Sequence, residues 1–245
     1  MSEEARLQSQ ADVDLGRAQY SDEDNQPAAI VSWERAIRRN PENAEAHLYL
    51  GTALGRIGQF ERAAVLLRRA VDLYVQQVRE DERLRAPLAE ARNSLGVVLI
   101  NLARYDEALA ALREASTEIT YTSHHLVQGN IGLALLRKGA LAEAVTALER
   151  SVSLQPNFCV GFARLGEALL QQSDHERALQ ALDRALSVPQ RGCDTIQEAW
   201  LNRARVHLHL HHNEQARSDL RRCVEIAAQT PEGRSCAALE GTVGP

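Results

Sequence analysis

Aromatic residues are scarce in this sequence, making up only 4% of its 245 positions, whereas hydrophobic residues of all kinds reach 44%. A core with so little aromatic mass has to be built from Ala, Leu and Val. Closely packed helices suit such a core, because sheets favour aromatic and β-branched side chains. The composition therefore favours an all-α fold.

Lysine and long apolar runs are also missing. Lys138 is the only lysine, and the formal net charge is −5. An excess of negative charge gives no electrostatic reason to bind nucleic acid or an anionic membrane surface. No window is apolar over the length that a bilayer requires. We therefore expect no nucleic-acid partner and no transmembrane helix.

The first residues show no signal peptide, because Met1 is followed by the polar, acidic run Ser2-Glu3-Glu4. Two interpretations are open at this point. Either the protein is cytosolic, or the sequence is that of a mature form made without its leader.

Cysteine is absent from the first 158 positions. The four that follow, Cys159, Cys193, Cys223 and Cys236, lack the spacing of a metal site such as C-x-x-C. Cys159 and Cys223 are expected to act as small buried hydrophobes. In an oxidising compartment we expect a disulfide between Cys193 and Cys223, because the loop before the last hairpin should lie near the end of that hairpin's second helix.

Motifs of enzymes are not found either. The sequence has no G-x-S-x-G, no G-x-x-x-x-G-K-[ST] and no H-E-x-x-H. His207 and His211 stand four residues apart near a run of histidines, a spacing that a metal could use on a helix. Both occupy structural positions of the repeat described next, so we favour a structural role for them. The sequence thus predicts a protein that is not an enzyme and needs no cofactor or metal.

What the sequence does contain is a repeat of about 34 residues with a small residue at its eighth position. The position-eight residues are Gly16, Gly51, Gly96, Gly132, Gly166 and Ala204. In the middle repeats an Ala follows twelve positions later and a large apolar residue four after that. This pattern is typical of tetratricopeptide repeats, in which two antiparallel helices, A and B, pack closely. It predicts a right-handed α-solenoid of six helical hairpins.

The predicted boundaries follow from this frame. We expect a single array over residues 1–230 and a flexible tail over 231–245. The repeats are expected near 9–42, 44–77, 89–122, 125–158, 159–192 and 197–230. Two insertions interrupt the period. One lengthens the first turn at 21–26, and the other, at 75–87, should extend the preceding helix, with an Asp81–Arg85 pair and Pro87 in the first turn of the next helix.

The inner face of such an array is formed by positions two, five, nine, twelve and thirteen of helix A. The candidate partner-binding residues there are Leu48, Asn93, Val97, Ile100, Leu126, Leu133, Leu136, Val160 and Leu170. An exposed apolar patch usually marks a binding site, here for an amphipathic helix or an apolar strand. A second copy of the chain, or its own tail, is the alternative occupant. Without lysine at these positions, a clamp for an acidic tail is not expected.

One passage of the sequence is more specific than the repeat. It contains Asn93–Gly96, Arg104–Ala108, Leu112–Ser116, Tyr121 and Asn130–Leu133. This passage resembles the type IV pilus pilotins, the Tgl/PilF/PilW group of six-repeat outer-membrane lipoproteins. Repeat number and order extend the resemblance over nearly the whole chain.

The resemblance implies a monomeric protein that carries an N-terminal lipid on the periplasmic face of the outer membrane. Its partner would be the secretin subunit of the type IV pilus machine, which it helps to assemble into a pore. Because no cysteine precedes Cys159, we expect Met1 to stand where the lipidated residue of the mature chain would be. The alternative is a general adaptor lipoprotein that recruits another complex, such as cell-wall enzymes.

Overall fold

The computed structural model describes residues 2–243 and divides the chain into two compact units. Unit 1 ends at Ser123 and unit 2 begins at His124, so the predicted array spans both. The described residues form helices and no strand, which confirms the predicted all-α fold. None of these helices combines the length and the apolar character that crossing a bilayer requires.

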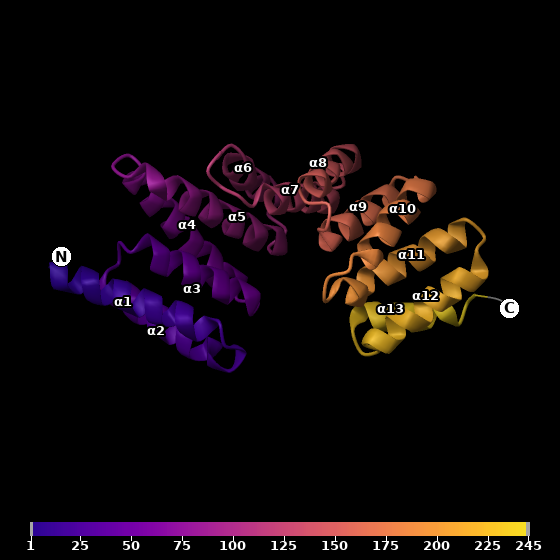
Figure 1. The fold of residues 1–245 in the computed structure, drawn as a ribbon, viewed down its shortest axis with the longest axis horizontal. Coiled ribbons are helices and arrows are strands. Elements are labelled where there is room, and N and C mark those ends of the chain that lie inside the picture. The colour runs from indigo at the N-terminus through magenta and orange to yellow at the C-terminus, as the bar shows by residue number, and fades with distance from the viewer. Residues whose placement is uncertain (1, 244–245) are drawn as a thin grey trace. The chain divides into compact units, whose positions relative to one another are not determined.

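Unit 1 consists of three helical hairpins, each an A helix followed by a B helix (Figure 1). Its helices are α1 (Glu3–Tyr20), α2 (Gln26–Arg39), α3 (Ala44–Arg56), α4 (Phe60–Gln77), α5 (Arg85–Asn101) and α6 (Tyr105–Ser116). Short 3₁₀ turns, η1 (Glu23–Asn25) and η2 (Glu82–Leu84), mark the two predicted insertions.

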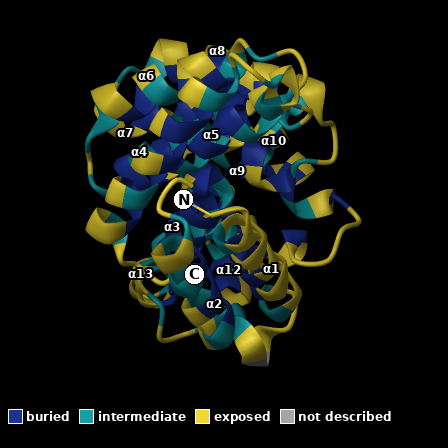
Figure 2. Cartoon of the chain, turned by 90° about the vertical axis from the view of Figure 1, so that its left-hand side faces the viewer, coloured by how far each residue is buried: buried dark blue, intermediate teal, exposed yellow. Residues whose placement is uncertain are grey.

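Unit 2 also contains three hairpins and then one further helix (Figure 1). Its helices are α7 (His124–Lys138), α8 (Leu141–Leu154), α9 (Cys159–Gln171), α10 (His175–Ser187), α11 (Gln197–His209), α12 (Asn213–Ile226) and α13 (Pro231–Glu240), with a 3₁₀ turn η3 (Cys193–Thr195) before α11. Within each unit, the buried residues lie where neighbouring helices face one another, and the exposed residues lie on the outer turns (Figure 2).

The position-eight glycines explain the close packing of the hairpins. A Cβ atom on these glycines would lie between 2.4 and 2.7 Å from the Cγ of a fully buried leucine at position twenty-four of the same repeat. The pairs are Gly51–Leu67, Gly96–Leu112, Gly132–Leu148 and Gly166–Leu182. The leucine thus occupies the space that any larger residue on helix A would need, as the frame predicts.

The turns from helix A to helix B share one backbone conformation in the last five hairpins. A residue with positive φ ends each A helix: Gly58 (80°), Ala103 (55°), Gly139 (85°), Ser173 (63°) and His211 (61°). The next amide donates to the carbonyl five residues earlier, over 2.8–3.0 Å, which is the Schellman arrangement. Glycine tolerates this conformation without strain and therefore indicates it in a sequence. Only two of the five turns contain glycine, so the sequence does not indicate the other three.

Two expectations about the segments between elements were wrong. Helix α4 ends at Gln77 and does not run through the insertion; the Asp81 side chain instead caps η2 and pairs with Arg83 at 2.8 Å, so the Asp81–Arg85 pair does not form. Pro87 does lie in the first turn of α5, as predicted.

The second wrong expectation concerns the C-terminus. Pro231–Glu240 forms helix α13 rather than a flexible tail, because Thr230 caps its N-terminus and Cys236 is buried against α12.

The buried His47 makes the stability of unit 1 depend on pH. Its Nε2 lies 3.0 Å from the Pro41 carbonyl oxygen, and its buried Nδ1 has no partner. Burial lowers the pKa of His47 below its usual value, against a smaller opposing effect of the Pro41 carbonyl. The folded state therefore binds this proton less readily than the unfolded chain, and stability is lost as pH falls below about 6.5.

We expect the urea midpoint of the protein to fall between pH 7.5 and pH 5.5, and His47→Gln to reduce that fall. Part of the fall will remain in the variant, because burial also lowers the pKa of His125 and of His207 in unit 2. An identical pH dependence of the variant and the unchanged protein would contradict the assignment to His47.

Candidate partner-binding surface

The predicted inner-face residues of unit 1 are only partly accessible. Val97 is 37% exposed and Asn93 is half-buried, whereas Leu48 and Ile100 are buried. The A helices α3 and α5 contact one another directly, so part of each inner face is covered by its neighbour. Leu48 and Ile100 therefore offer no binding surface, contrary to the expectation of an open apolar stripe.

Asn93 and Val97 line the same pocket between α3 and α5. Its volume is about 230 Å³. The lining residues are Thr52, Gly55, Arg56, Phe60, Asn93, Ser94, Val97, Val98 and Asn101. Gly55 keeps the pocket open, because a Cβ atom there would lie 3.0 Å from a Val98 methyl group. The lining thus combines apolar side chains with amide and hydroxyl groups and the Arg56 guanidinium, the composition of a site that orients a bound chain.

A row of aromatic rings supports the first two repeats. Trp33 lies between Tyr20 and Tyr49, with ring centroids 5.3 and 5.6 Å away. Arg17 lies over the Tyr49 ring at 5.7 Å. Burial, and then the charge of Glu45, raise the pKa of Tyr49 to about 12, so its hydroxyl stays protonated at neutral pH. The repeat pattern does not predict this cluster, because it specifies single positions and not contacts between rings of different helices.

In unit 2 the predicted residues again divide by exposure. Leu126 and Val160 are exposed at 36% and 37%, and Leu133 and Leu170 are half-buried. Leu136 is buried, in line with the contact between α7 and α9. Leu136 is therefore the third member of the predicted set that cannot meet a partner. Whether the remaining residues bind one stays a prediction.

Charged side chains that the sequence analysis left out occupy the same helix positions. Arg137 is at position thirteen of the fourth repeat, Glu167 at position nine of the fifth, and Glu198 at position two of the sixth. Arg137 pairs with Glu167 at 2.9 Å and with Glu198 at 3.7 Å. Burial, and then the charge of Glu198, raise the pKa of Glu167. Part of the inner face of unit 2 is thus charged, where the prediction described an apolar stripe.

The two histidines whose spacing could suit a metal lie in different elements. Helix α11 ends at His209, and His211 lies in the following turn, so His207 and His211 do not share a helix face. Among residues 2–243, no group of three His, Cys, Asp or Glu side chains is arranged to hold a metal ion.

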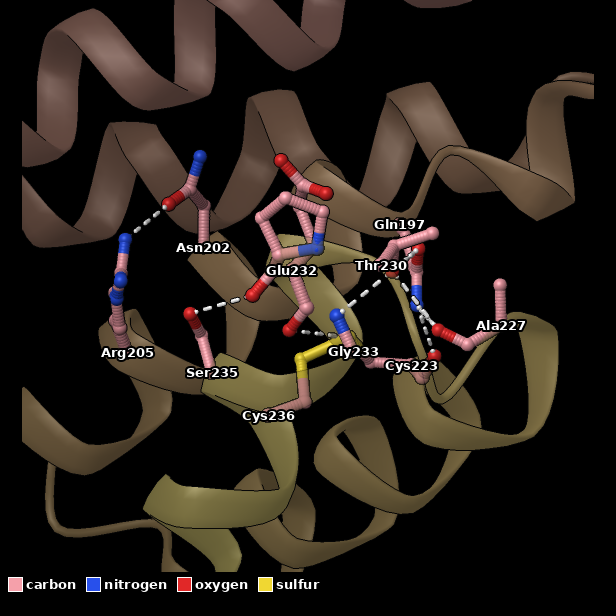
Figure 3. The surroundings of a disulfide bond; sticks show 11 residues. Gln197, Asn202, Arg205, Cys223, Ala227, Thr230, Glu232, Gly233, Ser235 and Cys236 are labelled. Atoms are coloured by element: carbon pink, nitrogen blue, oxygen red, sulfur yellow. Dashed lines mark hydrogen bonds between the residues drawn. A yellow bond between two sulfur atoms is a disulfide. The ribbon is translucent and has the colours of Figure 1, made fainter.

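The predicted disulfide Cys193–Cys223 is wrong. Cys159 pairs with Cys193, and Cys223 pairs with Cys236 of α13 (Figure 3). The first residue of α11, Gln197, does approach the end of α12: its Nε2 donates to the Cys223 and Ala227 carbonyl oxygens at 2.7 and 2.8 Å.

Cys193 instead packs with Cys159, Val188 and Ile196. Cys159 and Cys193 are 34 residues apart; Cys159 opens α9, whereas Cys193 lies in η3, before α11 begins at Gln197. The repeat frame alone therefore does not predict this pairing, because Cys193 lies in the segment between two repeats.

Comparison with known families finds tetratricopeptide repeats along most of the chain. One model of this repeat matches residues 13–77 and 163–231. Two further models of the repeat match residues 88–117 and 127–158.

Two characterised proteins are similar in sequence. The chain is 29% identical over 164 residues to the type IV pilus assembly protein PilF of Pseudomonas aeruginosa, across 67% of this chain and 61% of PilF. It is 27% identical over 143 residues to PYG7, a chloroplastic tetratricopeptide repeat protein of Arabidopsis thaliana, across 56% of this chain and 48% of PYG7. Both matches span less than two thirds of the relative.

Solved structures share the fold. The structure of P. aeruginosa PilF superposes with a TM-score of 0.71 at 23% identity, covering 96% of this chain and 98% of that one. PilW, a widely conserved type IV pilus biogenesis factor, superposes with a TM-score of 0.76 at 18% identity, covering 94% and 98%. The two superpositions show the shared fold, and the 29% sequence match supports the PilF part of the resemblance; neither bears on Tgl.

Proposed function

Because the chain belongs to the tetratricopeptide-repeat family, we propose that it binds a protein segment on the inner faces of its A helices in the service of type IV pilus biogenesis. The partner in this proposal is a secretin subunit, whose assembly at the outer membrane the protein promotes. Proteins of this repeat class work by presenting concave binding surfaces and not by catalysis. Similarity to PilF and PilW supports the link to the pilus.

The observation that carries the proposal is the pocket between α3 and α5. Its lining contains the exposed Val97 together with other apolar side chains and several polar groups. A secretin subunit has to keep apolar membrane-seeking segments from aggregating before it inserts. A pocket of this kind can take one apolar side chain of such a segment, in the way that a groove takes the anchor residues of an amphipathic helix.

The proposed location is the periplasmic face of the outer membrane, reached through an N-terminal lipid. Two disulfides support it, because disulfides persist in oxidising compartments such as the bacterial periplasm and are rare in the cytosol. Fractionation of cells that express the protein from its native gene tests the location, and recovery in the cytosolic fraction would contradict it.

Replacing Val97 with Asp tests the binding surface. A carboxylate at position 97 would lose its hydration against an apolar partner, so we expect binding of the secretin subunit to weaken about tenfold or more. Assembled secretin multimers in cells should fall with it. The measurement is the amount of multimer in cells whose own copy is replaced by the variant.

The matched control is Val65→Asp, since Val65 lies on helix α4 and is 66% exposed. Both variants should keep the thermal midpoint of the unchanged protein within a few degrees. Normal multimer levels with a stably folded Val97→Asp protein, or an equal loss with Val65→Asp, would contradict binding at this pocket.

A further inference from the structure

The inner face of unit 2 holds a second pocket of different character. Its volume is about 320 Å³, and its walls come from the end of α7, from α9, from α11 and from the first turns of α13. The lining residues are Arg137, Glu167, Leu170, Gln171, Glu198, Leu201, Asn202, Arg205, Pro231, Glu232 and Ser235. Most of these side chains are polar or charged, so water or a polar ligand occupies it more favourably than an apolar side chain.

Asn202 places a hydrogen-bond donor without a partner in this pocket. The residue is only 3% exposed. Its Oδ1 accepts a hydrogen bond from Arg205 over 3.1 Å. Its Nδ2 makes no hydrogen bond within residues 2–243 and is not among the fully shielded side-chain atoms, so it is accessible from the pocket. A buried amide gains from satisfying both of its polar atoms. A ligand with a carbonyl oxygen, such as a peptide group, would accept the hydrogen bond that Asn202 Nδ2 can donate.

Carboxylates outnumber guanidinium groups around the pocket. Glu167 and Glu198 share Arg137, as described above, whereas no cation of residues 2–243 pairs with the Glu232 side chain. In Figure 3 the side chains of Glu232 and Asn202 extend to the same side of α13, away from the Cys223–Cys236 bond. Burial is the main cause of the raised pKa of Glu167, so the excess of negative charge follows from the count of lining residues alone. A ligand bearing a cation would relieve that excess.

We propose that this pocket is a subsite for a basic residue of an extended partner segment. The arginine or lysine side chain pairs with Glu232, and a peptide carbonyl of the same segment accepts from Asn202 Nδ2. The subsite rests on the proposed function, because it specifies a basic side chain in the segment that binds the inner face. Its preference is opposite to that of a clamp for an acidic tail.

Helix α13 is held in place to form this wall before any ligand binds. Cys236 of α13 is bonded to Cys223 of α12. Thr230 donates to Gln197 Oε1 at 2.7 Å and accepts from the Gly233 amide at 3.0 Å, which fixes the first turn on which Glu232 stands (Figure 3). A wall fixed in this way loses little conformational entropy when a ligand binds.

Two blocked peptides of identical shape test the subsite: N-acetyl-Ser-Ala-Arg-Ala-Ser-amide and the same peptide with citrulline, the neutral counterpart of arginine. Binding to the full chain is followed by NMR chemical-shift titration. We expect the arginine peptide to bind about fivefold more tightly, the effect of one partly screened ion pair. We also expect Glu232→Gln to abolish the difference between the two peptides.

Glu176→Gln is the matched control, because Glu176 is an exposed residue of α10 away from the pocket. This variant should preserve the preference for arginine. Equal affinities of the two peptides, no binding of either at millimolar concentration, or an unchanged preference in Glu232→Gln would overturn the subsite. None of these results depends on Val97 in unit 1, so failure of the subsite and failure of secretin binding are distinguishable.

Discussion

Replacing both Cys159 and Cys193 with Ala will lower the free energy of unfolding by about 4 kcal/mol, because this bond closes a long loop in the unfolded chain. The two cysteines are separated by 34 residues, and both are buried beside Val188. Urea unfolding, followed by far-ultraviolet circular dichroism, measures the change. The variant should remain helical, since the hairpins on either side keep their own packing.

The second disulfide provides the comparison. Cys223 and Cys236 are separated by only 13 residues, so the same loss of loop entropy predicts about 3 kcal/mol for their double alanine variant. A change below about 1 kcal/mol for the Cys159 and Cys193 variant would contradict a stabilising bond. So would four titratable thiols in protein made under oxidising conditions.

Gly166→Ala will destabilise the fifth repeat by about 2 kcal/mol through overpacking. The new Cβ atom would lie 2.4 Å from Cγ of Leu182, which has no exposed surface into which it could move. Leu182→Ala alone should cost about 3 kcal/mol, because it leaves a cavity between α9 and α10.

Combining the two changes gives the sharper result. In the double variant the Cβ atom added at Gly166 enters the space that the leucine has left, so the loss should be at least about 1 kcal/mol smaller than the sum of the single losses. Denaturant unfolding of the unchanged protein, the two single variants and the double variant measures the coupling between the two positions. Additive losses would show that the two positions do not share a contact.

The hairpins could be predicted because each frame position has one dominant physical constraint. A residue without a side chain at position eight and a leucine at position twenty-four specify the approach of two helices. The turns were less visible in the sequence. Gly58 and Gly139 indicate a positive φ directly, but Ala103, Ser173 and His211 adopt it too, held there by the helices on both sides.

The candidate site was harder to predict, because exposure depends on neighbouring repeats and not on one helix. Leu48, Ile100 and Leu136 occupy inner-face positions, yet each is buried. Consecutive A helices contact one another within each unit, and the frame alone does not say which side chains this contact covers. The polar pocket of unit 2 was missed for a related reason, since Glu232 comes from a segment expected to be unstructured.

The order in which the cysteines pair has a consequence for how the protein is made. Four cysteines allow three sets of pairs, and here the first bonds to the second and the third to the fourth. When a chain enters an oxidising compartment N-terminus first, Cys193 can react with Cys159 before Cys223 has entered. The native partner is then the first free thiol that each cysteine meets, and no incorrect bond has to be broken by an isomerase.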